Sequence, residues 1–246
     1  MRKGLVIYEP RGRAGEYAPL AVNLYKGCGH GCVYCYAPEA TFTDRPIFFK
    51  PEARLDIIRK LIIDAPKAAE SFTGPERRVL LCFSSDPYQP INGVHDLTRQ
   101  AIDILHDSGF TINILTKGGS RACPDFDLLD HRDQYAATLT FASREKSKEW
   151  EPYAASPLDR MSALKCAKEN GIQTWVSLEP IIELEETLEV IQNTYQFVDL
   201  YKIGKLNYHP LAEKIDWVDV LDKVIKELKH FGCQYYIKKD MLPYLK

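Results

Sequence analysis

The sequence has no uninterrupted apolar stretch near the roughly 20 residues that a membrane-spanning helix needs. It also lacks an excess of charge of one sign: 32 Lys and Arg face 34 Asp and Glu, so the net charge of −2 predicts no bulk attraction to nucleic acid or anionic membranes. No internal repeat, low-complexity tract or long linker is present, and Glu9 comes too early for a secretory signal. Membrane-spanning, fibrous and disordered classes are thereby excluded. We expect one domain over residues 1–246 that stays in the cytosol.

The cysteines give no indication of a disulfide framework. There are seven, an odd number, and in a reducing compartment such residues are more often buried, metal-binding or catalytic than paired. Cys28, Cys32 and Cys35 lie within eight residues, whereas the other four are scattered. The cluster is therefore the feature to explain.

Short β-rich runs alternate with amphipathic helical windows along the chain. The predicted strands are residues 21–25, 79–84, 111–116, 135–141, 173–178 and 197–203. The predicted helical stripes are Leu55, Ile58, Leu61 and Ile62; Ile102 and Leu105 after a cap at Asp96; and Ile215, Val218, Leu221, Ile225 and Leu228. Ser156, Pro157 and Asp159 predict a capped helix start, and Gly171 predicts its end.

This repeated β/α pattern predicts a parallel sheet, either an open doubly wound sheet or a full or partial barrel. In both geometries, chemistry collects at the carboxyl ends of the strands. The cysteine loop follows the first predicted strand, and later strand ends carry polar residues at Ser84, Ser85, Asp86, Lys117, Ser143, Glu179 and Lys205. Lys202 and Lys205 are unusual for a buried strand, so we expect at least one of them to point into a cavity.

The spacing of the clustered cysteines is C-x3-C-x2-C on a loop that contains glycines. Three thiolates on such a loop can converge on a soft metal, because glycine lets the backbone fold tightly around it. They are one ligand short of a closed four-ligand site. A zinc site that uses His30 as the fourth donor is the alternative, although zinc sites usually gather ligands from two separated pairs.

These residues resemble the radical S-adenosylmethionine (SAM) superfamily, whose signature is C-x3-C-x-aromatic-C, with Tyr34 at the aromatic position. The resemblance implies an enzyme in which Cys28, Cys32 and Cys35 hold a [4Fe-4S] cluster and SAM chelates the fourth iron. Reduction would cleave SAM to methionine and a 5'-deoxyadenosyl radical. It also implies a partial (β/α)6-type parallel barrel and an external electron donor of the flavodoxin or ferredoxin type.

Residues 23–37 are similar to the spore photoproduct lyase-like branch of the superfamily, and further landmarks at residues 84–89, 115–117 and 140–143 follow in order. The resemblance implies a barrel core at residues 20–205, an N-terminal extension at 1–19 and a C-terminal helix and strand at 206–246. The cofactor-binding residues that it implies are Tyr34, Tyr36, Ser84, Ser85, Asp86, Lys117, Ser143 and Glu179. For the serines, Asp86 and Glu179, a purely structural role in a turn or helix cap is the alternative.

The chain departs from that branch at Phe83, where spore photoproduct lyases carry the cysteine that donates a hydrogen atom. Cys82 is adjacent, but neighbouring strand residues point to opposite faces, so we expect it to pack in the core. The repair mechanism then lacks its donor.

Three functions therefore compete. The first is a nucleic-acid-directed lyase or modifying enzyme, favoured by the family branch and by the basic residues Arg2, Lys3, Arg11, Arg13, Arg77 and Arg78. The second is a radical SAM enzyme that acts on a small molecule or peptide, favoured by the compact chain. The third is a non-catalytic zinc-binding interaction module, disfavoured by the polar residues at the strand ends. The sequence identifies neither the substrate nor the oligomeric state.

Overall fold

The computed structural model describes residues 6–245. Its core is one sheet of seven strands in the order β1-β4-β5-β6-β7-β8-β9, with every neighbouring pair parallel. The strands are β1 (Leu20–Val22), β4 (Arg78–Leu81), β5 (Thr111–Thr116), β6 (Gln134–Thr138), β7 (Gln173–Ile181), β8 (Leu200–Lys205) and β9 (Tyr235–Ile237). This confirms the predicted α/β class. Within residues 6–245 no pairing joins β1 to β9, which is compatible with a partial barrel.

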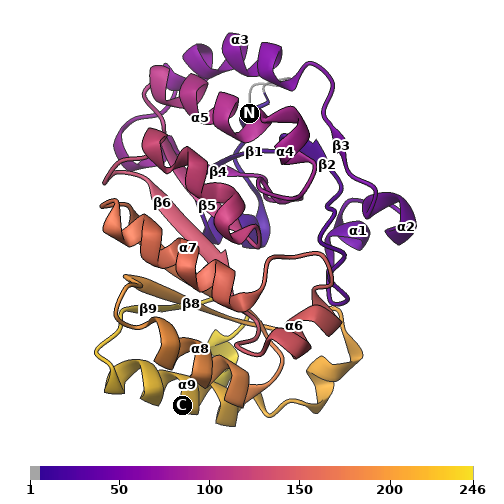
Figure 1. The fold of residues 1–246 in the computed structure, drawn as a ribbon, viewed down its shortest axis with the longest axis vertical. Helices are drawn as coiled ribbons and strands as arrows, with labels where there is room; N and C mark the ends of the chain where they lie inside the picture. The colour runs from indigo at the N-terminus through magenta and orange to yellow at the C-terminus, as the bar shows by residue number, and fades with distance from the viewer. Residues whose placement is uncertain (1–5, 246) are drawn as a thin grey trace.

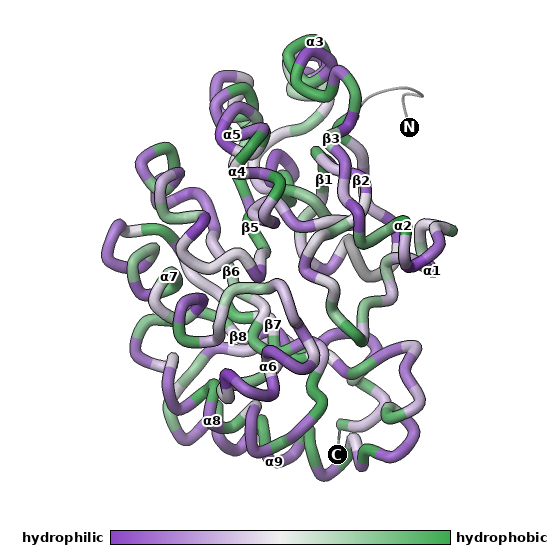
Figure 2. Tube along the Cα trace, turned by 45° about the vertical axis from the view of Figure 1, so that its right-hand side comes forward, coloured by the Kyte–Doolittle hydropathy of each residue, from purple (hydrophilic) through white to green (hydrophobic). Residues whose placement is uncertain are grey.

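The longer helices follow one another along one side of the sheet, in chain order (Figure 1). They are α3 (Ile57–Ala69), α5 (Leu97–Asp107), α7 (Pro157–Glu169), α8 (Leu184–Thr194) and α9 (Trp217–His230). The short helices are α1 (Ala37–Ala40), α2 (Arg45–Phe48), α4 (Asn92–His95) and α6 (Arg144–Trp150). Figure 2 shows α1 and α2 beside each other, on the opposite side of the molecule from α5 and α7.

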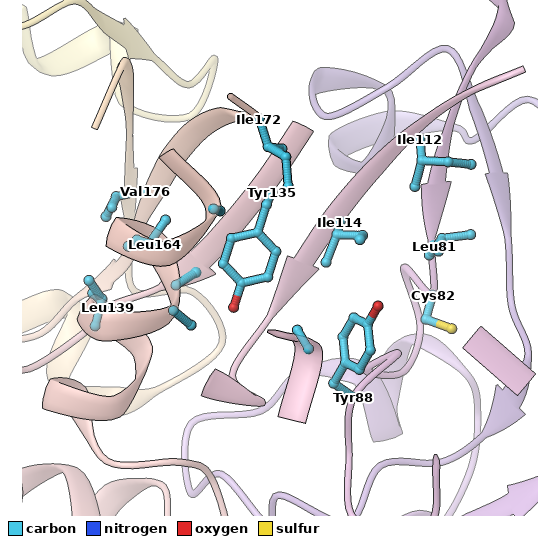
Figure 3. Packing of buried hydrophobic residues seen from close by; sticks show 14 of the residues in the cluster. Leu81, Cys82, Tyr88, Ile112, Ile114, Tyr135, Leu139, Leu164, Ile172 and Val176 are labelled. Carbon is cyan, nitrogen blue, oxygen red and sulfur yellow. The ribbon is translucent and has the colours of Figure 1, made fainter. Parts of the chain in front are cut away.

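The core lies between the strands and this helical layer. Figure 3 shows Ile114 of β5 and Tyr135 of β6 near Leu164 of α7, within one continuous cluster of buried apolar side chains. Strands β4 to β8 are buried almost throughout, because the helices cover one face and the interior of the barrel covers the other. This burial explains why their sequences are nearly continuous apolar runs.

The predicted start of α7 is correct, and Asp96 stands at the predicted N-cap position of α5, although its side chain makes no capping hydrogen bond. Ser156 accepts a hydrogen bond from the Asp159 backbone N–H, and Gly171 takes the left-handed φ of 77° after the helix. Asp96 stands in a left-handed turn between α4 and α5. Its φ of 50° is incompatible with the extended backbone of an ordinary N-cap.

Three predicted strands end earlier than expected: the run at 135–141 ends at Thr138, and the other two end at turns. The run at 21–25 divides at Val22, and the next strand, β2 (Tyr25–Lys26), pairs antiparallel with β3 (Glu52–Ala53) in a separate small sheet. The run at 79–84 ends at Leu81, because Cys82 takes a left-handed φ of 63° and leaves the pleat. Local β propensity did not reveal either turn.

The apolar stripe predicted for α3 is only partly the buried one. Leu61 is buried, but Leu55 precedes the helix and is 81% exposed, and Ile62 is 55% exposed. The buried face runs through Ile57, Leu61, Ala65 and Ala68. The buried residues of α9 are Trp217, Val220, Leu221, Val224 and Leu228. Of the predicted stripe, Ile215 lies before the helix, and Val218 and Ile225 are only partly buried beside it.

The segment that precedes β1 contributes to the interior of the sheet. The ring of Tyr17 stacks on Trp175 of β7 at 5.7 Å, and the Tyr17 carbonyl accepts a hydrogen bond of 2.8 Å from Asn113 of β5. Glu16 accepts from the Tyr236 hydroxyl and the Lys239 backbone N–H beyond β9. Met1 to Leu5, including the predicted basic residues Arg2 and Lys3, lie outside the described residues. Across residues 6–245, no helix has the length and apolarity to cross a membrane.

Candidate active site

A cavity opens where the strands β4, β5, β6, β7 and β8 end. All three motif cysteines line it, together with every residue predicted to bind the cofactor except Ser143. Its lining also includes Tyr17, His30, Cys82, Phe83 and Lys205. The strand-end rule therefore predicted which side chains meet at this cavity.

The cysteine loop folds tightly around two glycines. Gly27 has a φ of 71° and Gly31 a φ of 66°, both in the left-handed region that glycine adopts without strain. All three cysteines are free thiols. Burial raises the pKa of each one, that of Cys32 to about 12, and the Lys117 charge opposes the shift at Cys32 and Cys35. Thiolates in this loop therefore need a bound cation or a nearby positive charge.

The donor chemistry of the loop fits an iron–sulfur cluster. Three thiols on one glycine-containing turn, all facing the same cavity, supply the soft ligands that iron in such clusters takes. Within residues 6–245, no three His, Cys, Asp or Glu side chains already lie close enough together to hold a metal ion. The fit therefore rests on the donor set and the loop.

His30 does not complete a zinc site with the cysteines. Its Nε2 lies 3.1 Å from Asp86 Oδ2, and its Nδ1 lies 3.3 Å from the Tyr153 carbonyl oxygen. Both ring nitrogens thus contact groups other than the thiols. The zinc interpretation loses its fourth donor.

Asp86 connects the cysteine loop to two strand ends. Its carboxylate accepts hydrogen bonds from the Thr116 hydroxyl at 2.6 Å and from the backbone N–H groups of Tyr88 and Lys117, each at 2.8 Å. Burial raises its pKa, but His30 and these donors outweigh burial and hold the pKa well below its usual range. In this structure Asp86 orients the loop, and its acceptor positions are used within the protein.

Tyr34 is anchored behind the loop by a buried ion pair. Its hydroxyl contacts the Glu151 carboxylate and lies 3.2 Å from Thr140 Oγ1. Arg160 of α7 pairs with Glu151 at 2.5 Å, and both side chains are almost fully buried. Lys117 Nζ stands 5.5 Å from the centre of the Tyr34 ring and makes no ion pair with the described residues. Lys117 is thus a cation available at the cavity wall.

The predicted serine sites divide into cavity and scaffold positions. Ser84 lines the cavity, and its backbone N–H is held by Asn23. The Ser85 hydroxyl donates to the Gly27 carbonyl oxygen at 2.5 Å and accepts from Gln89, so it secures the loop. Ser143 lies outside the cavity lining, where it caps α6 by accepting from the Lys146 N–H.

Glu179 is held at the cavity wall by partners that the sequence did not indicate. Its carboxylate accepts from the Tyr17 hydroxyl at 2.5 Å and pairs with Lys238. Gly204 of β8 makes room, because a Cβ there would lie 2.8 Å from the Glu179 side chain. Tyr17 comes from a segment 162 residues away in the chain, and no local motif marks it.

The prediction that one of two lysines faces the cavity is confirmed. Lys205 lines the cavity, and its Nζ donates to the Tyr244 hydroxyl at 3.1 Å. Lys202 instead packs over the Trp175 ring at 4.2 Å, where burial and then Lys238 lower its pKa to about 8. Tyr36 also lines the cavity, and the centre of its ring lies 5.9 Å from that of Tyr208.

Phe83 and Cys82 both border the cavity, which corrects the expectation that they point to opposite faces. The strand has ended before them, so its alternation no longer applies. Cys82 is nevertheless 4% exposed, and its Sγ accepts a hydrogen bond of 3.5 Å from the Leu24 N–H. Phe83 lies 6.2 Å from Tyr17, ring centre to ring centre.

The class that this fold and site define is an α/β enzyme with three cavity-facing thiols at the carboxyl edge of a parallel sheet. The chain belongs to the radical SAM superfamily, whose sequence model matches residues 22–198. It is accordingly a radical SAM enzyme, and the family implies a [4Fe-4S] cluster and SAM as its cofactors. The interpretation as a non-catalytic zinc module is overturned.

Relatives of known sequence extend over much of the chain. An uncharacterized protein of Methanocaldococcus jannaschii is 27% identical over 222 residues, which are 89% of this chain and 77% of that protein. An uncharacterized protein of Mycobacterium tuberculosis is 29% identical over 171 residues, or 65% of this chain and 49% of that protein.

Solved structures of similar fold include a spore photoproduct lyase variant with bound AdoMet and dinucleoside spore photoproduct. It has a TM-score of 0.74 at 15% identity, over 96% of this chain and 79% of that one. SuiB of Streptococcus suis has a TM-score of 0.64 at 13% identity, over 90% of this chain and 50% of that one. At these identities the likeness concerns the fold alone.

Proposed function

We propose that this enzyme abstracts a hydrogen atom from a nucleotide-containing substrate in a lyase-like or repair-like reaction. The observation that carries the substrate class is the edge of the cavity at Tyr36, where the ring of Tyr208 is 78% exposed beside it. An exposed aromatic ring at the entrance to a cavity offers a stacking surface for a base. Lys205 adds a cation in the same cavity for a phosphate.

The proposed roles of the other residues follow from their chemistry. Cys28, Cys32 and Cys35 would hold the [4Fe-4S] cluster, and Lys117 suits the carboxylate of SAM. Ser84 suits a hydroxyl or amino group, while Tyr34 and Tyr36 offer flat faces to the adenine. When bound, the two cofactors supply the 5'-deoxyadenosyl radical. The surrounding cavity walls exclude water and hold the reacting carbon close to it.

The reaction also needs an electron from outside. We propose an external one-electron donor of the flavodoxin or ferredoxin type as a partner. Ser143, Asp86 and Ser85 act in this proposal as scaffold for the loops, since their side chains are already bonded within the protein.

The cofactor part of the proposal is tested on anaerobically reconstituted protein. We expect a brown protein with broad absorption near ~400 nm that slowly converts SAM to methionine and 5'-deoxyadenosine with dithionite. Replacing any motif cysteine with alanine should abolish cluster assembly, whereas Cys233→Ala should leave iron content near normal. Colourless protein with stoichiometric zinc would contradict the proposal.

The substrate part is tested by fluorescence anisotropy with a labelled oligothymidylate. We expect binding that weakens steeply with salt, because phosphate contacts release counterions. Tyr208→Ala should weaken binding about tenfold, because the loss of one stacked base costs about 1–3 kcal/mol of binding free energy. Phe42→Ala is the matched control: Phe42 is 98% exposed, but it is Tyr208 whose ring lies against the cavity-lining Tyr36. Salt-independent binding, or equal effects of both variants, would contradict a nucleotide substrate.

A small molecule or peptide is the second candidate substrate. The balanced charge of the chain and Phe83 in place of the donor cysteine favour it. Incubation of the reduced enzyme with SAM and a spore-photoproduct dinucleotide tests whether the spore photoproduct itself is the substrate. We expect no thymine dinucleotide above the enzyme-free control, because Phe83 cannot donate a hydrogen atom and the Cys82 thiol is 4% exposed and bonded to the Leu24 N–H.

A further inference from the structure

Helix α2 contacts the backbone of the cysteine loop on both sides of the motif. The Cys28 backbone N–H donates a 2.9 Å hydrogen bond to the carbonyl oxygen of Phe48, at the end of α2. Gly27 permits this approach, because a Cβ at that position would lie 2.2 Å from the same oxygen. The first cysteine is thereby tied to α2.

The other two cysteines are tied to α2 by Arg45. Its guanidinium donates to the carbonyl oxygens of Cys35 at 2.8 Å, Val33 at 2.9 Å and Cys32 at 3.5 Å. Its outer edge pairs with Glu39 at 3.1 Å, and the guanidinium carbon stands 5.4 Å from the centre of the Phe49 ring. One side chain thus contacts the second and third cysteines and Val33, one of the two residues between them.

Arginine is the side chain that suits this position. Its planar fork presents several N–H donors in fixed directions, whereas a lysine ammonium is a compact charge on a flexible stem. Three carbonyl oxygens that converge on one guanidinium also keep its positive charge next to the loop. A cluster on these cysteines gains a negative charge when it is reduced, so a nearby cation favours the reduced state.

We propose that Arg45 is a positioning residue for the iron–sulfur cluster, which it serves by clamping the backbone between Cys32 and Cys35 and by supplying positive charge to the loop. This inference rests on the proposed cluster on the three cysteines, and it is independent of the substrate. Arg45 has two effects, on loop geometry and on local charge, and different substitutions remove them.

The experiment compares Arg45→Gln and Arg45→Lys in the reconstituted enzyme, with Arg132→Gln as the control. Arg132 also forms an exposed ion pair, with Asp130, but its guanidinium donates to that carboxylate and not to the cysteine loop. Two properties are measured: the midpoint potential of the cluster, by anaerobic redox titration, and the rate at which an iron chelator removes the iron.

We expect Arg45→Gln to make one-electron reduction about tenfold less favourable, a decrease of about 59 mV, and to release iron faster. Arg45→Lys keeps the charge and loses the fork, so it should keep the wild-type potential but also release iron faster. Arg132→Gln should match the wild type in both properties.

A wild-type potential in Arg45→Gln overturns the charge role, and wild-type iron release in both variants overturns the clamp. If Arg45→Gln takes up no cluster, Arg45→Lys decides: wild-type iron release overturns the proposal, and faster release at an unchanged potential supports it. A wild-type protein that assembles no cluster would instead contradict the proposed function.

Discussion

Individual residues in the cysteine loop differ in how much change they tolerate, although their sequence context is similar. Gly27 combines a left-handed φ with a close approach to the Phe48 carbonyl oxygen, whereas Gly29 is not among the positive-φ glycines and a Cβ there would make only ordinary contacts. The thiols depend on the loop conformation that the first glycine permits. The two glycines therefore form a matched pair of test positions.

We expect Gly27→Ala to prevent cluster assembly. The new Cβ would lie 2.2 Å from the Phe48 oxygen and would impose a strained φ of 71°, so the Cys28 N–H must leave its acceptor. Gly29→Ala should retain iron, because its Cβ would meet Pro51 at 3.4 Å, an ordinary contact. Iron and sulfide content after anaerobic reconstitution measures both; equal iron content in the two variants would refute the role of Gly27.

A second residue-scale prediction concerns Lys117. We expect Lys117→Ala to weaken SAM binding about tenfold or more while the cluster remains, because removing a charge-assisted contact to a carboxylate costs about 1.5–3 kcal/mol. Equilibrium dialysis with labelled SAM measures the affinity, and visible absorption measures the cluster. Unchanged affinity would remove Lys117 from the SAM site.

The connection between helices α6 and α7 is the element that supports the cysteine loop from behind. Glu151 lies in this connection, Arg160 is the fourth residue of α7, and Tyr34 brings the loop to them. The backbone adds a further tie, because the Val33 N–H donates to the Trp150 carbonyl oxygen at 2.9 Å. The Ser156 cap sets where α7 begins and thereby places Arg160 against Glu151.

We expect Glu151→Gln to lower the free energy of unfolding by about 3–5 kcal/mol, because it leaves the Arg160 charge buried without its counterion. Glu169→Gln is the control, since its 4.0 Å pair with Lys165 is exposed and should change stability by less than about 0.5 kcal/mol. Urea unfolding followed by circular dichroism compares the two variants. A loss below about 1 kcal/mol in Glu151→Gln would contradict the prediction.

The same pair predicts a pH dependence. Burial raises the pKa of Glu151, but the charges of Arg160 and Lys117 outweigh burial and lower it overall. The stabilisation is therefore complete above the ordinary glutamate pKa of about 4.3 and is lost as the pH falls through the lower folded-state pKa. Glu151→Gln should lack this acid-dependent component.

At the scale of the whole molecule, the sheet is held together by side chains of the segment before β1 as well as by strand pairing. The segment before β1 places Tyr17 against β5 and β7, while Glu16 and Lys238 connect it to the region around β9. First and last parts of the described chain thus meet beneath the cavity. Asn113 is fully buried at this junction and bonds both Tyr17 and Trp175.

We expect Asn113→Leu to destabilise the fold by about 2–5 kcal/mol, because the Tyr17 carbonyl oxygen and the Trp175 indole N–H would each lose a partner. Gln134→Ala, which removes only a 3.3 Å contact with exposed Gln173, should cost less than about 0.5 kcal/mol. Urea unfolding again gives the comparison, and a stable Asn113→Leu protein would show that this junction is dispensable.

The sequence by itself determined features that depend on neighbouring residues. The cysteine spacing, the β/α alternation and the α7 cap each occupy a short stretch of chain, and the rule that parallel strands end at one edge placed most of the predicted residues around one cavity. It did not distinguish cavity residues from scaffold residues at the same strand ends, such as Ser84 from Ser143. That difference depends on which hydrogen-bond partner another element brings near.

Only the tertiary structure decided the supports of the site. Tyr17 meets Glu179 across 162 residues of chain, and Tyr34 meets Glu151 across 117. Arg45 is only ten residues from Cys35, yet its role arises from a turn after α1 that returns α2 to the loop. Such contacts leave no periodic signal, because packing chooses partners by position in space, whereas sequence patterns record only neighbours along the chain.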